Sequence, residues 1–200
     1  MDTKNIGLRN IEVADTKISY IDGQKGKLIY RGYDILDLTK NSNFEETSYL
    51  LMYGELPNKK QLEVFDKSLK DERKLPEKIY DVIEIVKDSH PMDVLRTAVS
   101  TLSSFDEDRE DFSEEAIIRK GIRLTSQVPM IVMAHNRMRK GLDPIEPSKT
   151  LAHASNFLYM LEGEEPSEDT ARLMDIEFVV HANHGCNAPA FTRKLVTGTT

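Results

Sequence analysis

The residues best suited to chemistry lie close together near the carboxyl end of the sequence. Residues 181–187, called here the histidine cluster, contain two imidazoles, a thiol and two amides: His181, Asn183, His184, Cys186 and Asn187. An imidazole can donate a hydrogen bond to a substrate carbonyl or a developing oxyanion, and it titrates near neutral pH. The histidine cluster therefore suits a site that binds and polarises a carbonyl compound.

Spacing alone leaves two other interpretations of this cluster open. The histidines can be buried, hydrogen-bonded structural residues. His181 and His184 also have a spacing that can share one helix face and bind zinc, with Cys186 as a third ligand if the chain turns at Gly185. A zinc site needs three or four ligands, and no second His/Cys pair with matching spacing occurs in the sequence. We therefore expect no metal here.

Signals for other catalytic sites are missing from the sequence. It has no Gly-x-Ser-x-Gly elbow, no phosphate-binding loop and no Gly-x-Gly-x-x-Gly fingerprint. The three remaining histidines, His90, His135 and His153, are interpreted as surface or hydrogen-bonded structural residues. The acidic run 106–115 is interpreted as a solvated loop that leads into a helix.

The composition restricts the class of protein. Of the 200 residues, 39% are hydrophobic and 30% are charged, which is typical of a globular domain. The net charge of −7 argues against a general nucleic-acid surface, and no stretch approaches the ~18 apolar residues of a membrane helix. The amino terminus does not resemble a signal peptide, and the single cysteine fits a reducing compartment. We expect a soluble cytoplasmic protein that binds neither nucleic acid nor membranes.

The elements that must position the cluster are almost all helices. Residues 16–31 alternate apolar and polar side chains around the loop 22–26, which predicts a small β-hairpin. Helical periodicity follows it, with about eight helices joined mostly by short loops, so the predicted fold class is mainly α.

Capping residues predict where the helices begin. Asn43, Ser113, Ser148 and Ser167 are each placed to cap one. The helix after Ser148 is expected to run to residue 162, and Pro129 is expected to kink or break the long helix that follows Ser113.

Five segments also carry a family resemblance. They are residues 27–35 (KLIYRGYDI), 49–57 (YLLMYGELP), 90–97 (HPMDVLRT), 156–161 (NFLYML) and the histidine cluster. In this order they resemble the archaeal and bacterial citrate synthases and 2-methylcitrate synthases. The resemblance implies the multi-helical large domain of that family, with residues 1–200 as its N-terminal part and the small domain absent.

The resemblance further implies an acyltransferase that condenses oxaloacetate with acetyl-CoA or propionyl-CoA, without a metal or redox cofactor. In the family, a carboxylate takes a proton from the thioester methyl group, and a histidine stabilises the enol that attacks oxaloacetate. His184 matches the family histidine that binds oxaloacetate and polarises its carbonyl. His181 and Asn187 are expected to support it.

The sequence departs from the family pattern within and just after the cluster. Asn183 stands where many relatives have an acid, and Pro189 removes a hydroxyl that helps to orient the family's catalytic histidine. The family's catalytic histidine and carboxylate would lie beyond Thr200. We therefore expect half of an active site that is inactive alone, in a chain whose partner is a second copy in a homodimer or a complementary C-terminal chain. The alternative is a non-catalytic helical interaction subunit derived from the same family.

Overall fold

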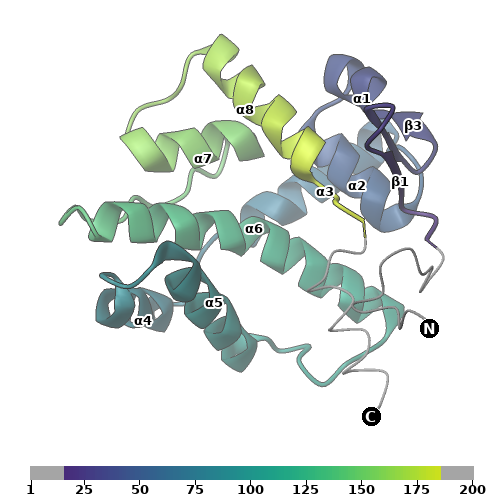
Figure 1. Ribbon diagram of the computed structural model, residues 1–200. Coiled ribbons are helices and arrows are strands. Elements are labelled where there is room, and N and C mark those ends of the chain that lie inside the picture. The colour runs from purple at the N-terminus through teal and green to yellow at the C-terminus, as the bar shows by residue number, and fades with distance from the viewer. Residues whose placement is uncertain (1–15, 186–200) are drawn as a thin grey trace, which may run out of the picture.

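The amino-terminal part of the protein is a small antiparallel sheet. The structure, a computed structural model, describes residues 16–185 (Figure 1). Strands β1 (Ser19–Asp22) and β2 (Lys27–Tyr30) pair antiparallel, which confirms the predicted hairpin. A short third strand, β3 (Tyr33–Asp34), pairs with β2 and was not predicted.

The turn between β2 and β3 holds a non-glycine residue in the left-handed region. Arg31 has φ +48° and Gly32 has φ +95°, the pattern of a two-residue hairpin turn with positive φ at both central positions. The Arg31 side chain donates from Nη2 to the carbonyl oxygen of Leu51 at 3.1 Å. This bond ties the turn to the end of the second helix and helps to offset the conformational cost at Arg31.

Eight α-helices follow the sheet within residues 16–185, and most of the predicted helix starts are confirmed. The helices are α1 (Ile35–Asn41), α2 (Phe44–Tyr53), α3 (Lys59–Asp71), α4 (Glu77–Val86), α5 (Pro91–Leu102), α6 (Glu114–Met138), α7 (His153–Glu162) and α8 (Glu168–His181). The side chains of Asn43, Ser113 and Ser167 accept backbone N–H bonds at the starts of α2, α6 and α8. Helix α1, which was not predicted, is capped by Asp34.

The start predicted for α7 is wrong. Ser148 does not cap this helix, since its Oγ accepts the N–H groups of Thr150 and Leu151, each at 3.2 Å, and so closes a separate turn. The helix begins five residues later, at His153. A serine favours a capped turn as readily as a helix start, so the local signal did not distinguish the two.

Helix α6 continues through Pro129, so the predicted break does not occur, and the alternative, a kink, stays a prediction. Proline removes one helical hydrogen bond and crowds the preceding turn. That cost is met by packing, because the residues just after it are buried in the main hydrophobic core. These residues are Met130, Ile131, Met133 and Ala134.

Helix α6 is also the centre of the molecule. Helices α4 and α5 pack on one side of it and α7 on the other, with α8 next to α7 (Figure 1). A second hydrophobic cluster joins the sheet, α1 and α2 to α8. Its buried members are Tyr30, Leu38, Phe44, Leu50 and Val179. This second cluster fixes α8, and therefore the start of the histidine cluster, against the amino-terminal hairpin.

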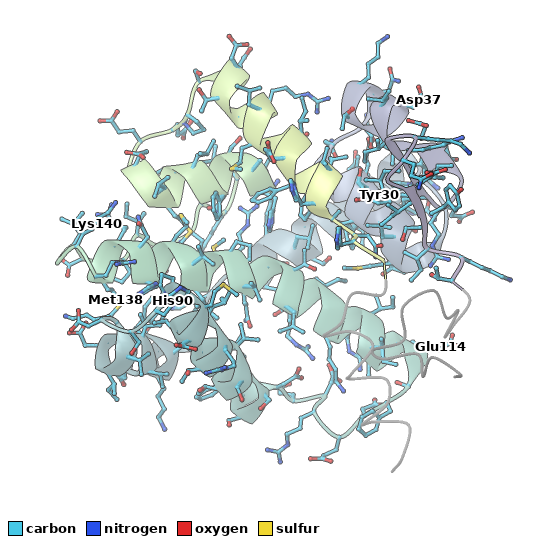
Figure 2. All side chains as sticks on the ribbon, viewed as in Figure 1. Tyr30, Asp37, His90, Glu114, Met138 and Lys140 are labelled. Atoms are coloured by element: carbon cyan, nitrogen blue, oxygen red, sulfur yellow. The ribbon has the colours of Figure 1, made fainter. Side chains whose placement is uncertain are left out.

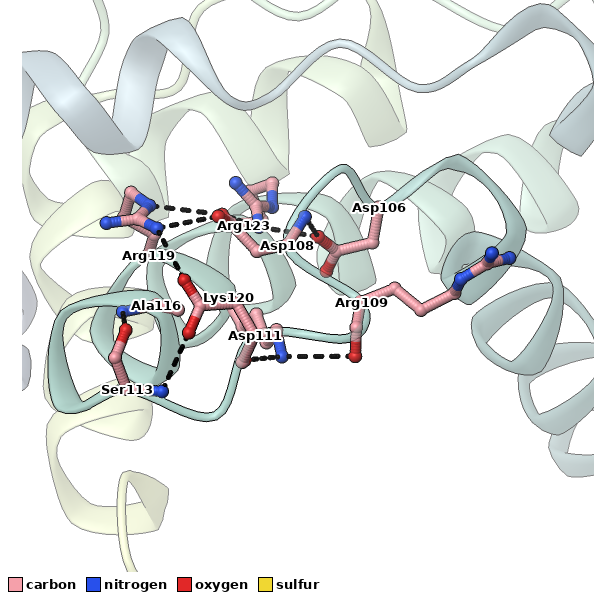
Figure 3. Close-up of polar contacts among 9 residues, drawn as sticks. All are labelled: Asp106, Asp108, Arg109, Asp111, Ser113, Ala116, Arg119, Lys120 and Arg123. Atoms are coloured by element: carbon pink, nitrogen blue, oxygen red, sulfur yellow. Dashed lines mark hydrogen bonds and ion pairs between the residues drawn. The ribbon is translucent and has the colours of Figure 1, made fainter.

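The acidic loop between α5 and α6 is paired with arginines rather than simply solvated (Figure 3). Arg119 donates to Asp108 through Nε at 3.0 Å and Nη2 at 2.6 Å. Arg123 Nη2 lies 2.6 Å from oxygens of both Asp106 and Asp108. The hydrogen bonds from Arg119, and then those from Arg123, hold the pKa of Asp108 well below its usual range.

Asp108→Asn is expected to loosen this loop without unfolding the protein. The pKa of Asp108 is depressed in the folded state, so its stabilising effect is present above the usual aspartate pKa and is lost as the pH falls through the folded value. Hydrogen exchange of the amides in residues 109–113 should become faster at pH 7, with the melting temperature nearly unchanged. Unchanged exchange in this loop would show that the ion pairs do not hold it.

Candidate functional site

The candidate site lies where the chain leaves α8. The helix is held by its buried side: Val179 is fully buried, and the Phe178 ring lies 5.3 Å from Phe44 of α2 and 5.6 Å from His153 of α7. The helix ends at His181, and residues 182–185 carry the chain away without regular structure. His184 lies in this short segment, so its position depends on what anchors the segment.

Tyr30 provides the central anchor of this segment. Its side chain on β2 is fully buried, and its hydroxyl lies 2.7 Å from the carbonyl oxygen of Val180 and 3.0 Å from that of Asn183. The same hydroxyl accepts the Asn183 N–H at 3.2 Å. Burial raises the pKa of Tyr30, which keeps the hydroxyl protonated and able to donate. Tyr30 therefore joins the sheet to the end of α8 (Figure 2).

A second anchor passes through the side chain of Asn183. Its Oδ1 accepts from Ser19 Oγ at 2.7 Å and from the Gly185 N–H at 2.8 Å. A carboxylate can accept the same two bonds, so the asparagine has the acceptor chemistry of the acid that the family resemblance leads us to expect at this position. Gly185 has φ +66°, and a Cβ atom there would lie 3.7 Å from Ile21 Cδ1. A left-handed residue close to the sheet thus ends the segment.

Between these two anchors, His184 is exposed. Its side chain makes no hydrogen bond to any of the residues that the structure describes. The interpretation of His184 as a buried structural histidine is therefore wrong. An exposed imidazole on a tethered segment is able to donate a hydrogen bond to a ligand.

The structure places His181 differently. Its side chain is 74% exposed, and Nδ1 lies 2.9 Å from the carbonyl oxygen of Glu177 and 3.3 Å from Glu177 Oε2. It thus contacts its own helix. Cys186, Asn187 and Pro189 lie outside the described residues. The supporting roles of His181 and Asn187 stay predictions.

Within residues 16–185, no group of three or more His, Cys, Asp or Glu side chains is arranged to hold a metal ion. In the same part of the chain, no helix is both long and apolar enough to cross a membrane.

One cavity is not part of this site. A hollow of about 650 Å³ lies between α2 and α6, and Met52, Tyr53 and Ile118 contribute to its lining, whereas His184 does not.

Sequence reasoning missed a second group of polar residues, the buried polar centre formed by Glu45, Arg73 and His153. Glu45 Oε1 accepts the backbone N–H of His153 at 2.7 Å. Arg73 Nη1 donates to the carbonyl oxygens of Ser148 and Leu151 at 2.7 and 2.9 Å. The centre therefore joins α2, the end of α3 and the start of α7.

Burial sets the protonation of this centre. His153 is 1% exposed and packs against Phe44, with ring centroids 4.7 Å apart and ring planes tilted by 32°. Its Nδ1 has no hydrogen-bond partner among residues 16–185. Burial, and secondarily the charge of Arg73, lowers the pKa of His153 to about 3, whereas burial raises the pKa of Glu45. The expectation that His153 lies on the surface or is fully hydrogen-bonded is therefore wrong. No local pattern marked this residue, because its partners lie far away in the sequence.

Comparison with known proteins identifies the family. The sequence profile described as "Citrate synthase, C-terminal domain" matches residues 7–200. This chain belongs to the citrate synthase family. The citrate synthase of Haloferax volcanii is 42% identical over 198 residues, which are 96% of this chain and 52% of that protein. A 2-methylcitrate synthase of Mycobacterium tuberculosis is 36% identical over 194 residues, 96% of this chain and 49% of that protein.

Solved structures of citrate synthases agree with the fold. The enzyme from Pyrobaculum aerophilum superposes with a TM-score of 0.91 at 36% identity, covering 96% of this chain and 50% of that one. The enzyme from Thermotoga maritima gives a TM-score of 0.77 at 35% identity, covering 93% and 48%. The predicted multi-helical citrate synthase fold is thereby confirmed. The chain spans about half the length of the relatives it matches, and its placement as the N-terminal half stays a prediction.

Proposed function

We propose that this chain supplies the oxaloacetate-binding part of a citrate synthase-type active site. The complete site would condense acetyl-CoA or propionyl-CoA with oxaloacetate to give citrate or methylcitrate and CoA. The observation that carries the proposal is the exposed imidazole of His184, tethered at the end of α8 in a chain that aligns with citrate synthases over 96% of its length. No metal or redox cofactor enters the proposal.

The proposed role of His184 is to bind and polarise the ketone of oxaloacetate. A hydrogen bond from the imidazole to the ketone oxygen draws electron density from the carbonyl carbon. It also stabilises the negative charge that develops on this oxygen when the carbon is attacked. The enol of the acyl-CoA attacks this carbon, forming the new carbon–carbon bond. Water then cleaves the thioester and releases CoA.

The proton-abstracting carboxylate and the histidine that stabilises the enol belong to the half of the family's site that we expect outside this chain. Proton abstraction needs a positioned base, so the chain alone is expected to be inactive. We propose that a complementary C-terminal chain completes the site, with a homodimer as the alternative assembly of this chain, and that the assembled enzyme works in the cytoplasm.

A complementation assay tests this proposal. The chain is mixed with a polypeptide that carries the remaining half of the Pyrobaculum aerophilum enzyme, and CoA release from acetyl-CoA or propionyl-CoA with oxaloacetate is followed by thiol detection. We expect release only from the mixture. Release from neither substrate, with any such half or with both halves in one chain, would contradict the proposal.

His184→Ala is expected to weaken oxaloacetate binding by at least about tenfold, because the hydrogen bond to a polarised carbonyl is lost. Isothermal titration of the mixture with oxaloacetate measures this change. The matched control is His90→Ala, which removes an exposed imidazole at the start of α5 and should leave the affinity unchanged. Wild-type protein that assembles without binding oxaloacetate would instead support the non-catalytic interaction subunit.

A further inference from the structure

The position of His184 is set by very few contacts. Residues 182–185 belong to neither helix nor sheet. Apart from bonds within this segment and to α8, their hydrogen bonds to the described residues 16–185 are made to the hairpin alone. Those bonds come from Tyr30 on β2 and Ser19 on β1, about 150 residues earlier in the chain. The hairpin is therefore what holds the segment in place.

The Tyr30 hydroxyl is the more demanding of the two contacts. It meets the carbonyl oxygen of Val180, which lies in the last turn of α8, where helical carbonyls lack partners within the helix. It also meets both the N–H and the carbonyl oxygen of Asn183. One hydroxyl thus fixes the backbone at two points: Val180, inside the last turn of the helix, and Asn183, the residue directly before His184.

The Tyr30 ring itself has little freedom to move. It is fully buried and packs in the cluster with Leu38, Phe44, Leu50 and Val179. A hydroxyl on such a ring therefore holds residues 182–185 at a nearly fixed position relative to the sheet. In a binding site, the residues that contact the ligand must be held to within about 0.5 Å of the productive geometry. The neighbouring residues that hold them in place provide this precision.

We propose that Tyr30 is a positioning residue for His184: its hydroxyl sets the place from which the imidazole meets the ketone of oxaloacetate. Ser19 assists by holding the Asn183 side chain. The inference rests on the proposed function, because it assigns Tyr30 a role in that same oxaloacetate site. Tyr30 acts through the segment and is not expected to touch the substrate.

Tyr30→Phe tests the proposal, since it removes one oxygen and leaves the buried ring. The matched control is Tyr80→Phe, which makes the same change on α4, where Tyr80 packs against the main hydrophobic core. Proteins with isotope-labelled histidine are compared by NMR well below their melting temperatures, so that a loss of stability does not itself alter the spectra. Each is then assembled with the complementary half and titrated with oxaloacetate.

We expect Tyr30→Phe to shift the His184 imidazole signals and to weaken oxaloacetate binding about tenfold, the size of one lost hydrogen bond. Tyr80→Phe should change neither. Ser19→Ala removes only the bond to the Asn183 side chain and should shift the His184 signals in the same direction by less. If Tyr30→Phe fails to fold, Ser19→Ala and its effect on affinity decide the question.

Unchanged His184 signals and an affinity within about twofold of wild type would overturn the positioning role of Tyr30. A different result would contradict the proposed function: assembled wild-type protein that does not bind oxaloacetate. In that case the His184 signals of the Tyr30→Phe variant still show whether the hydroxyl positions the imidazole.

Discussion

Replacing Arg73 by leucine is expected to lower the free energy of unfolding by about 3–5 kcal/mol, because two charge-assisted hydrogen bonds to buried carbonyl oxygens are lost, each contributing about 1.5–3 kcal/mol. Arg73 is 1% exposed, and its guanidinium satisfies the carbonyl oxygens of Ser148 and Leu151. Leucine leaves both carbonyls without their donor. It also removes a positive charge that interacts electrostatically with Glu45, whose carboxyl is already hard to ionise because burial raises its pKa.

Denaturant unfolding at pH 7 measures this loss. The matched control is Arg96→Leu, where the side chain is 78% exposed and pairs with Asp93 on the surface of α5. Surface ion pairs contribute less than about 1 kcal/mol, so this control should remain close to wild type. If Arg73→Leu also stayed within about 1 kcal/mol, the buried polar centre would not be stabilising the junction of α3 and α7.

Acidification from pH 7 to pH 4 is expected to cost the protein about 3 kcal/mol through His153 alone. Burial lowers the folded-state pKa of His153 from 6.5 to about 3. Below pH 6.5 the unfolded chain takes up a proton that the folded chain does not, so stability falls as the pH falls towards 3. Glu45 works in the opposite direction, because its raised folded-state pKa means that the folded chain gains a proton first.

His153→Phe removes the titrating group and keeps a ring between Phe44 and Phe178. Its unfolding free energy, measured at several pH values between 7 and 4, should therefore fall less steeply than that of wild type. Glu45 is present in both proteins, so the difference between the curves reports mainly on His153. The control His181→Gln removes an exposed imidazole and should retain the wild-type slope. Parallel curves for wild type and His153→Phe would show that His153 is not held neutral in the folded state.

Local signals in the sequence predicted most of the helical architecture. Asn43 and Ser113 cap helices because their side chains meet backbone N–H groups only three residues away, a contact that needs no distant partner. The same locality explains the failure at Ser148, whose side chain caps a turn with equally close partners. It also explains Pro129, because the packing that keeps α6 continuous comes from other helices.

The fold class, the hairpin and the family follow from local patterns, since alternation, capping residues and five short motifs are all recognisable along the chain. The sequence also singled out His184 through its motif. The contacts that hold His184 became visible in the folded structure alone, because Tyr30 and Asn183 are 153 residues apart in the sequence. The folded structure alone likewise shows that His153 is buried and neutral, since burial depends on which helices close around a side chain and not on the residues beside it.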